Sequence, residues 1–316
     1  MRKWLALAAT GVMALGVAAC GDDDSDSGGG SGGGGNLSGT IKIDGSSTVA
    51  PLSEAAAELF QAENPDVRVT VGTSGTGGGF EKFCAGETDI SDASRAIEED
   101  EIALCKKEGI EYEEIQVAND GLALIVSPAN EFATCLTVDE VKTIYDKGSK
   151  VNNWSEVNPD FEDLEMELFG AGTDSGTFDY FTEAINGEEG RSRADYNATE
   201  DDNVTIQGVS GADGGVGYLG LSYVQQNEGK VKAVEIDGGD GCVAPTNDTV
   251  QDASYKPLSR PLFVYPSAKA LDRPEVKAFV EFYLDNAEAI AEQALFVGLT
   301  QEQLKKSQGK VARLGK

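Results

Sequence analysis

The sequence contains no histidine among its 316 residues. Imidazole is the usual general base of Ser-His-Asp and Cys-His catalysis and a common zinc ligand, so sites of these kinds are excluded. Basic residues are also scarce, because 25 Lys and Arg stand against 55 Asp and Glu, for a formal net charge of −30. Such a charge disfavours nucleic acid and anionic membrane surfaces as partners. These absences favour a binding protein over an enzyme.

What is present suits a globular chain with room for two domains. Hydrophobic residues make up 40% of the sequence and charged residues 25%, which is ordinary for folded proteins. A chain of this length buries about 75% of the surface of its unfolded form. We therefore expect a sizeable core.

The N-terminus has the order of an export signal. Residues 1–19 begin with Met1-Arg2-Lys3 and continue with an apolar run that is too short for a comfortable membrane span. The run closes with Val17-Ala18-Ala19-Cys20, which resembles a bacterial lipobox. An acidic, Ser/Gly-rich stretch at 20–37 follows and is too polar to pack. We expect an exported protein anchored by a lipid on Cys20 at the outer face of the cell membrane; an ordinary signal peptide with a chance cysteine is the alternative.

Four further cysteines suit disulfide bonds in an exported protein. They are Cys84, Cys105, Cys135 and Cys242. Four cysteines can pair in three ways, and we favour 84–105 with 135–242 because each bridge then stays within one domain. Metal ligation is the rival interpretation, but the chain has no CxxC pair and no histidine to complete such a site. We expect no metal and no cofactor.

Three times a short strand is followed by a small polar loop and a helix. The strands are expected at 40–44, 67–71 and 164–169, the loops at 45–48, 74–79 and 175–177, and the helices at 49–62, 80–85 and 178–185. This order predicts an α/β fold with a parallel sheet whose loops gather at the carboxyl ends of the strands, where ligands bind.

Apolar strands at 116–118, 122–126 and 262–265 should carry the chain from one domain to the other and back. We therefore expect one lobe from residues 38–118 with 259–316, and a second lobe from residues 119–258.

Each of the three loops could hold an oxyanion. A helix N-terminus has unpaired N–H groups and about half a positive charge, and Ser and Thr hydroxyls add donors. Taken singly, each loop is equally well explained by helix capping. The same placement in two lobes favours one anion shared in the cleft between them.

The loops also resemble a known family, the periplasmic phosphate-binding proteins of Pst-type ABC transporters. The resemblance covers nearly all of residues 38–316. Its motifs are Asp44–Pro51, Gly72–Phe80, Asp89–Arg95, Thr137–Glu140, Asn153–Val157, Gly172–Phe178 and Leu258–Leu262. It implies a two-lobed periplasmic-binding-protein fold of type II with a ligand cleft between the lobes. It also implies a monomer that closes on one inorganic phosphate and delivers it to the permease subunits of the transporter.

The resemblance implies a set of phosphate ligands in this chain. They are Ser47, Thr48, Val49, Ser74, Gly75, Asp92, Arg95, Ser175, Gly176 and Thr177. Asp92 matches a carboxylate that accepts a hydrogen bond from the proton of the phosphate, which would select phosphate over sulfate, an anion without that proton. Many members carry an arginine four residues before the serine of Ser-Gly-Thr, where this chain has Ala171. We expect Arg95 to replace it and to pair with Asp92 and the ligand.

Two other functions remain open at this point. The same fold could bind sulfate, molybdate or tungstate, or serve as a phosphate sensor. An extracellular phosphohydrolase would need a metal pair held by carboxylates or a serine nucleophile with an unusual activator, because histidine is lacking.

Overall fold

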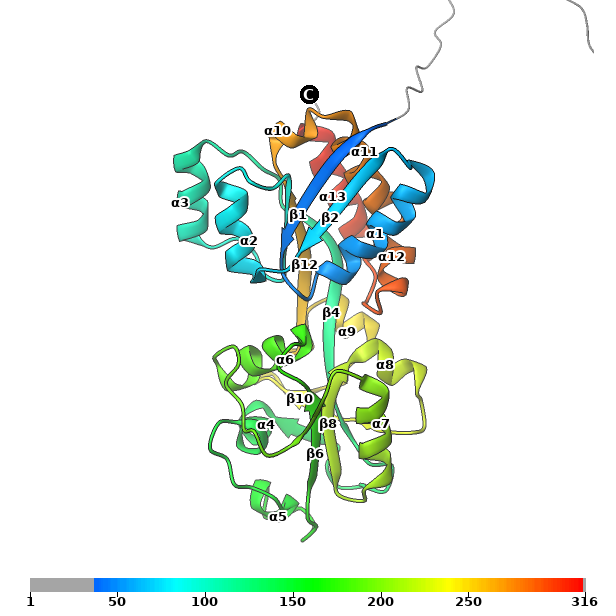
Figure 1. Cartoon of the computed structure of the whole chain (residues 1–316). Helices are drawn as coiled ribbons and strands as arrows, with labels where there is room; N and C mark the ends of the chain where they lie inside the picture. The colour runs from blue at the N-terminus through cyan, green and yellow to red at the C-terminus, as the bar shows by residue number, and fades with distance from the viewer. Residues whose placement is uncertain (1–36, 315–316) are drawn as a thin grey trace, which may run out of the picture. The chain divides into compact units, whose positions relative to one another are not determined.

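The computed structural model describes residues 37–314 of the chain (Figure 1). The expected signal segment, Cys20 and the stretch up to residue 36 lie outside these residues. The strands are β1 (Gly39–Gly45), β2 (Val67–Gly72), β3 (Ile90–Ala93), β4 (Ile115–Val126), β5 (Cys135–Thr137), β6 (Glu167–Ala171), β7 (Asn197–Thr199), β8 (Gly215–Gly220), β9 (Lys232–Ala233), β10 (Glu235–Asp237), β11 (Cys242–Val243) and β12 (Ser259–Pro266).

The helices are mostly short. They are α1 (Ala50–Glu63), α2 (Gly75–Cys84), α3 (Glu99–Glu108), α4 (Val138–Tyr145), α5 (Trp154–Val157), α6 (Gly176–Phe181), the π-helix η1 (Thr182–Asn186), α7 (Asp202–Gly211), α8 (Leu221–Gln226), α9 (Asn247–Gln251), α10 (Ala268–Leu271), α11 (Pro274–Asp285), α12 (Ala287–Gln293) and α13 (Gln301–Leu314).

The order of strand, loop and helix is confirmed at all three predicted places, but several boundaries are wrong. The strand expected at 164–169 is β6 at Glu167–Ala171, and α6 begins at Gly176 rather than at residue 178. The largest shift is in the second loop. Helix α2 begins at Gly75 rather than at residue 80, so most of the expected second loop is helical. A Cβ atom on Gly79 would lie 2.5 Å from the Cα of Gly45. Glycine therefore serves here to let α2 pack directly against the end of β1, and not to form a loop.

The main sheet is mixed, where the sequence predicted a parallel one. Strand β1 pairs in parallel with β2 and β3, and β12 runs antiparallel between β3 and β4. Strand β8 is antiparallel to β4 and parallel to β6, which is in turn parallel to β7. The strands expected at 116–118 and 122–126 are the single strand β4. Its first part pairs with β12 and its second with β8, so both halves of the fold share it (Figure 1).

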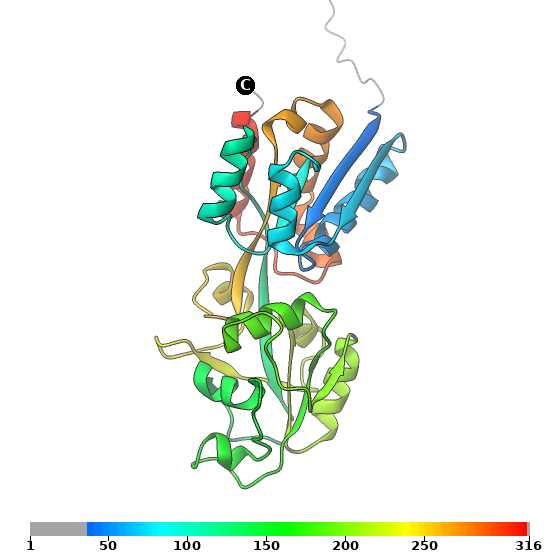
Figure 2. The same ribbon diagram turned by 60° about the vertical axis from the view of Figure 1, so that its left-hand side comes forward.

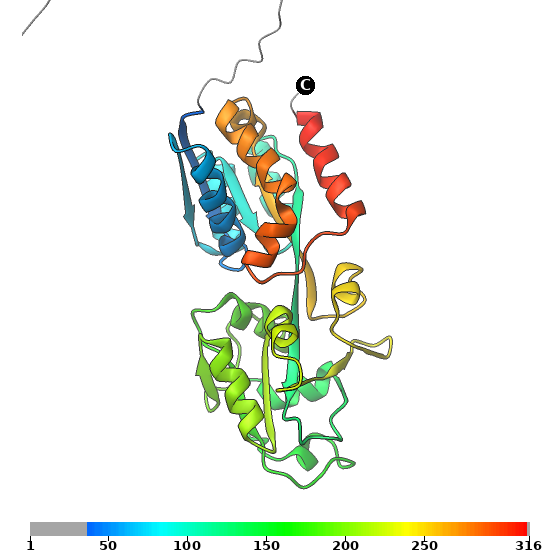
Figure 3. The same cartoon turned by 90° about the vertical axis from the view of Figure 1, so that its right-hand side faces the viewer.

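Apolar side chains form two large clusters, one around each half of this shared strand. One cluster takes its buried members from residues 122–258 and adds Val297. The other draws on residues 41–118 and 262–311. A third, smaller cluster forms between α2, α3 and β12. Helices α1, α11 and α12 lie on one face of β1, and α2 and α3 on the other, while α13 runs alongside β4 and α11 (Figures 2 and 3).

Both favoured disulfides are confirmed. Cys84 bonds to Cys105 and ties α2 to α3, and Cys135 bonds to Cys242 and ties β5 to β11. None of the helices within residues 37–314 is both long and apolar enough to cross a membrane.

Candidate functional site

The first predicted loop turns sharply from β1 into α1. Gly45 has a φ of +148°, and a Cβ there would collide with the carbonyl oxygen of Asp92. Ser46 donates its N–H to that same oxygen at 2.9 Å. The turn places Ser47, Thr48 and Val49 directly before the first turn of α1, where backbone N–H groups have no acceptor within the helix.

The first and third predicted loops touch each other. A Cβ on Gly176 would lie 2.7 Å from Oγ1 of Thr48 and 3.1 Å from its Cα and N atoms. Ser175 caps α6, because its Oγ accepts the N–H of Thr177 at 3.1 Å. Two segments more than a hundred residues apart in the sequence therefore meet with their small residues face to face.

Arg260, on β12, lies at this meeting point. Its Nη2 donates to Oγ1 of Thr48 at 3.0 Å and its Nε to Oδ2 of Asp120 at 3.2 Å. The guanidinium also stacks on the ring of Tyr180, 3.5 Å from the ring centroid. The side chain of Arg260 is only 13% exposed and that of Asp120 only 6%, so this ion pair is shielded from water.

Two carboxyl groups near Arg260 have raised pKa values. Burial raises the pKa of Asp120, and the neighbouring Arg260 opposes that rise. Burial, together with the charge of Glu189, raises the pKa of Asp179 on α6 to about 6, again against the pull of Arg260. The guanidinium of Arg260 thus lies near two carboxyl groups whose ionised form is disfavoured by burial.

The second predicted loop does not offer its donors to a ligand in this structure. Ser74 donates both its N–H and its hydroxyl to Oδ1 of Asp44, and Lys82 donates to the other oxygen of that carboxylate at 2.7 Å. Gly75, with a φ of +78°, opens α2 directly after Ser74. The expectation that Ser74 presents free donors is therefore wrong for this structure, because the carboxylate of Asp44, at the end of β1, accepts hydrogen bonds from both its N–H and its hydroxyl.

The expected pairing of Arg95 with Asp92 is also wrong. Arg95 forms two parallel hydrogen bonds with Glu101, each 2.8 Å long, and a further ion pair with Glu98 at 3.1 Å. Both partners belong to the start of α3, where Glu101 also accepts the N–H of Glu98. Arg95 lies two residues beyond the end of β3, on the side of the chain that leads into α3, so these carboxylates rather than Asp92 are its partners.

Asp92 is buried beneath α1. Its side chain has no exposed surface, Oδ1 accepts the hydroxyl of Ser53 at 2.9 Å, and no partner is found for Oδ2 within residues 37–314. Burial, with a smaller push from Asp44 and Glu54 and against the bond from Ser53, raises the pKa of Asp92 to about 8. An unpaired buried carboxyl oxygen is costly, so this atom is a candidate for a further contact.

Sequence reasoning thus placed Thr48 and Gly176 correctly beside each other but missed Arg260, Asp120 and Tyr180. Arg260 does fall inside the segment Leu258–Leu262 that was noticed for its resemblance. Its partner could not be read from the sequence, because Arg260 and Asp120 face each other only through the register of β12 on β4.

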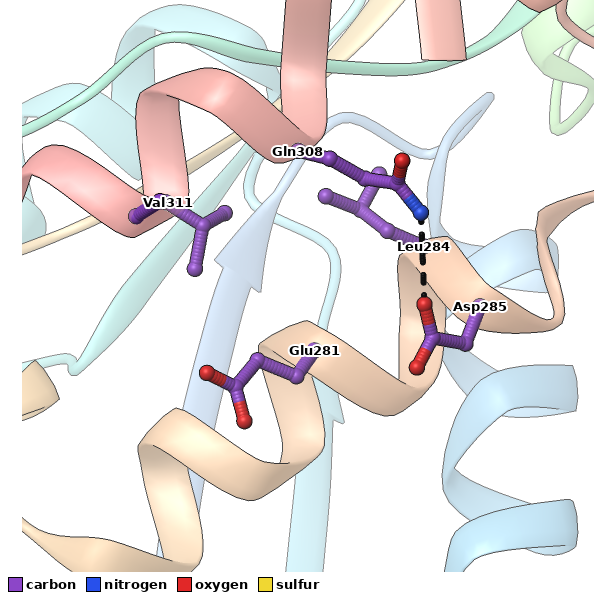
Figure 4. A pocket seen from close by; sticks show the side chains of 6 residues that line it. Glu281, Leu284, Asp285, Gln308 and Val311 are labelled. Atoms are coloured by element: carbon purple, nitrogen blue, oxygen red, sulfur yellow. Dashed lines mark hydrogen bonds between the residues drawn. The ribbon is translucent and has the colours of Figure 1, made fainter. Parts of the chain in front are cut away.

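A separate hollow of about 280 Å³ lies between α11 and α13 (Figure 4). Its lining includes the carboxylates of Glu281 and Asp285, and Gln308 donates to Asp285 at 3.3 Å. Two carboxylates would repel an oxyanion. This hollow therefore does not compete with the Arg260 region as an anion site.

Comparison with known proteins gives consistent results. A model of the PBP superfamily domain matches residues 30–287. The phosphate-binding protein PstS of Staphylococcus saprophyticus is 39% identical over 314 residues, which cover 98% of this chain and 95% of that protein. Protein SphX of Synechococcus elongatus is 45% identical over 262 residues, covering 82% and 77%.

Solved structures agree. The crystal structure of a possible phosphate-binding protein from Planctomyces limnophilus superposes with a TM-score of 0.85 at 47% identity, covering 89% of this chain and all of that one. A phosphate transport receptor from Vibrio cholerae, 24% identical, has the same fold with a TM-score of 0.64 over 82% of this chain and all of that one.

Proposed function

The chain belongs to the PBP superfamily and, within it, to the family of PstS-type phosphate-binding proteins, and on this basis we propose that it binds inorganic phosphate and delivers it to an ABC permease. The observation that carries the proposal is the contact between Thr48 and Gly176 beside the guanidinium of Arg260. Two loops rich in small hydroxyl residues meet next to a shielded cation there. Such a place suits a compact oxyanion.

The donors of the proposed site come from both loops. The backbone N–H groups of Ser47 and Thr48, before α1, and of Gly176, at the start of α6, are proposed as donors. The N–H groups of Val49 and Thr177 already donate to the hydroxyl oxygens of Ser46 and Ser175, at 3.4 and 3.1 Å, and would have to turn from these to the anion. The hydroxyls of Thr48 and Ser175 each accept a hydrogen bond, from Arg260 and Thr177 respectively. Each hydroxyl keeps its own hydrogen to donate, because a Ser or Thr side chain is donor and acceptor at once.

Ser74, Gly75 and Arg95 remain predictions from the sequence as ligand residues. To contact the anion, Ser74 would have to release Asp44, and Arg95 would have to release Glu101. In this structure both side chains bond to carboxylates of the protein itself and not to a ligand.

Asp92 is proposed as the group that distinguishes phosphate from sulfate. When Asp92 is ionised, its free oxygen accepts a hydrogen bond from the protonated oxygen of phosphate and repels sulfate. With its pKa raised to about 8, however, Asp92 is itself protonated at lower pH and then donates a hydrogen bond to either anion. Selectivity for phosphate should therefore increase as the pH rises through about 8.

We further propose the arrangement of the whole protein. One lobe comprises residues 38–118 with 259–316 and the other residues 119–258, a division that the two large apolar clusters support. The lobes would close on the anion in a monomer that is exported and held at the membrane by a lipid on Cys20. Cys20→Ala should release the protein from the membrane fraction of cells that express it.

Calorimetric titration tests the proposed function. The full chain would be partly unfolded and refolded to strip carried-over ligand, then titrated with phosphate and, separately, with sulfate at neutral and alkaline pH. Binding of one phosphate per chain, with sulfate increasingly excluded above pH 8, is the expected result. Sulfate or molybdate binding in preference to phosphate would contradict the proposed ligand.

A further inference from the structure

We propose that Arg260 is the cationic residue that binds the oxyanion, in the role that the sequence suggested for Arg95. This inference rests on the proposed function, since it names a residue of the same site. It follows from comparing the surroundings of the two arginines.

All three nitrogens of the Arg95 guanidinium already have partners. Nη1 and Nη2 both bond to Glu101, Nε lies 3.1 Å from a carboxylate oxygen of Glu98, and Nη1 also donates to the carbonyl of Ala96 at 3.2 Å. One positive charge faces two negative ones. The cluster as a whole therefore repels an anion.

Arg260 is the opposite case. It has one carboxylate partner, Asp120, which occupies Nε, and one neutral partner, the hydroxyl of Thr48, on Nη2. Within the described range no hydrogen bond is formed by Nη1. Both N–H groups of Nη1, and one of Nη2, are thus left for a ligand, and they are arranged as the fork that binds a tetrahedral oxyanion through two oxygens.

The surroundings also strengthen any bond that Arg260 makes. Its side chain is 13% exposed, so solvent screens it little. Tyr180 covers one face of the guanidinium and is itself held by a hydrogen bond from its hydroxyl to the carbonyl of Pro257 at 2.8 Å. Asp120 sits directly opposite on β4 and fixes Nε. Held on three sides, the guanidinium loses little freedom when it binds.

Position explains why this arginine could take over. Arg260 lies on β12 next to the shared strand β4, and it contacts Thr48 before α1 and Tyr180 on α6. These contacts come from the two segments that the proposed site joins. Ala171, four residues before Ser175, is buried and carries no charge. The position at which many related proteins have an arginine therefore supplies no cation in this chain.

The test is calorimetric titration of the full chain with inorganic phosphate, comparing Arg260→Gln with Arg95→Gln as the matched control. We expect Arg260→Gln to weaken phosphate binding about 100-fold, because a charged hydrogen-bond pair is lost. Arg95→Gln should change the affinity less than about threefold. An equal loss in both variants, or a loss confined to Arg95→Gln, would overturn the inference.

Arg260→Gln leaves Asp120 without its partner, which can prevent folding. The double variant Asp120→Asn/Arg260→Gln removes both charges and provides the same comparison, with circular dichroism to verify folding. We expect it to bind phosphate about 100-fold more weakly than the unaltered chain, and equal binding would refute the role of Arg260. Should the unaltered chain itself bind no phosphate, the proposed function fails, whereas normal binding by the chain and by both Arg260 variants defeats this inference alone.

Discussion

Two regions of this chain contain the same ingredients, a Gly/Ser/Thr segment between a strand and a helix with an arginine nearby, yet they differ in what the arginine contacts. We call the first the Arg260 site; it comprises Thr48, Asp120, Gly176, Tyr180 and Arg260. The second, the Arg95 cluster, comprises Ser74, Gly75, Arg95, Glu98 and Glu101. Within residues 37–314 the guanidinium of Arg260 pairs with one carboxylate and has no hydrogen bond on Nη1, whereas the guanidinium of Arg95 pairs with two carboxylates and has a partner on each of its three nitrogens.

The difference shows how an acidic protein can keep an anion site. Because the protein has a net charge of −30, an arginine near its surface usually has carboxylates close enough to pair with it. Arg95 is 33% exposed and pairs with two of them. Arg260 is shielded by β4, by the segment before α1 and by α6, and within residues 37–314 it pairs with one carboxylate, Asp120. Burial against a single acidic partner, rather than the presence of arginine and glycine in the sequence, is what leaves donors for a ligand.

The largest expected effect concerns Asp92. Its pKa is about 8 in the folded chain against an ordinary value of 3.8. Between these values the folded state keeps a proton that the unfolded state has lost, so the free energy of unfolding falls as the pH rises, and this contribution is complete below about pH 4 and gone above about 8. Between pH 5 and 8 the fall is at most about 4 kcal/mol. Asp92→Asn should remove this part of the fall and leave the smaller part due to other carboxyl groups such as Asp179, whose pKa is raised to about 6. Urea unfolding of phosphate-free protein at pH 5 and pH 8 would reveal the difference.

A pH dependence that is the same in the variant and in the unaltered chain would contradict this account of Asp92. Ser53→Ala is a useful companion, because it removes the hydroxyl that donates to Asp92 without removing the carboxyl. It should raise the pKa further and leave the dependence on pH in place.

The next largest effect is expected from removing the disulfide that joins α2 and α3, the two helices beside the Arg95 cluster. Cys84 and Cys105 are separated by 21 residues, and opening a loop of that size lowers the free energy of unfolding by about 3 kcal/mol. Cys84→Ala/Cys105→Ala should therefore melt at a lower temperature. Its phosphate affinity should change less than about twofold, because the side-chain hydrogen bonds of Arg260 and Tyr180 within residues 37–314 go to Thr48, Asp120 and Pro257, which lie outside α2 and α3. A tenfold weaker affinity in the folded variant would place the ligand at the Arg95 cluster instead.

Adding one methyl group to each region sharpens the comparison further. Gly176→Ala would place a Cβ 2.7 Å from Oγ1 of Thr48 and force the two loops apart, so we expect phosphate binding to weaken about 10-fold or more. Gly77→Ala in α2 is the control, since its nearest atoms would be 3.9 Å away. That change should leave binding intact and stabilise the helix by up to about 1 kcal/mol.

The smallest expected effect is that of Ser74. Because its hydroxyl serves Asp44, Ser74→Ala should lower the free energy of unfolding by about 1 kcal/mol while leaving the phosphate dissociation constant nearly unchanged. Ser175→Ala, the matched change in the other loop, should weaken binding several-fold through the loss of a donor. If Ser74→Ala were the more damaging to binding, the comparison of the two regions would be reversed.

Local signals were enough to predict much of this fold. The order of strand, loop and helix follows from residues close in sequence, and the disulfide pairs follow from the assumption that each bridge stays within one domain. The mixed sheet could not be foreseen, because the antiparallel placement of β12 between β3 and β4 depends on strands more than a hundred residues apart.

The errors at the site have two different causes. Arg260 depends on a cross-strand partner, Asp120, and on a ring from the other half of the fold, neither of which has a signal in the sequence. The partners of Arg95 did have one. Glu98 and Glu101 stand three and six residues beyond it, at the start of a helix where acidic side chains are favoured. A search for nearby carboxylates would have shown that this guanidinium was already engaged.

A crystal structure of the phosphate complex tests the central claim most directly. The account predicts a phosphate oxygen within hydrogen-bond distance of Nη1 of Arg260, next to Thr48 and Gly176, with Arg95 still bonded to Glu101. A phosphate held by Arg95 and Ser74, with Arg260 making only its present contacts to Asp120 and Thr48, would contradict it.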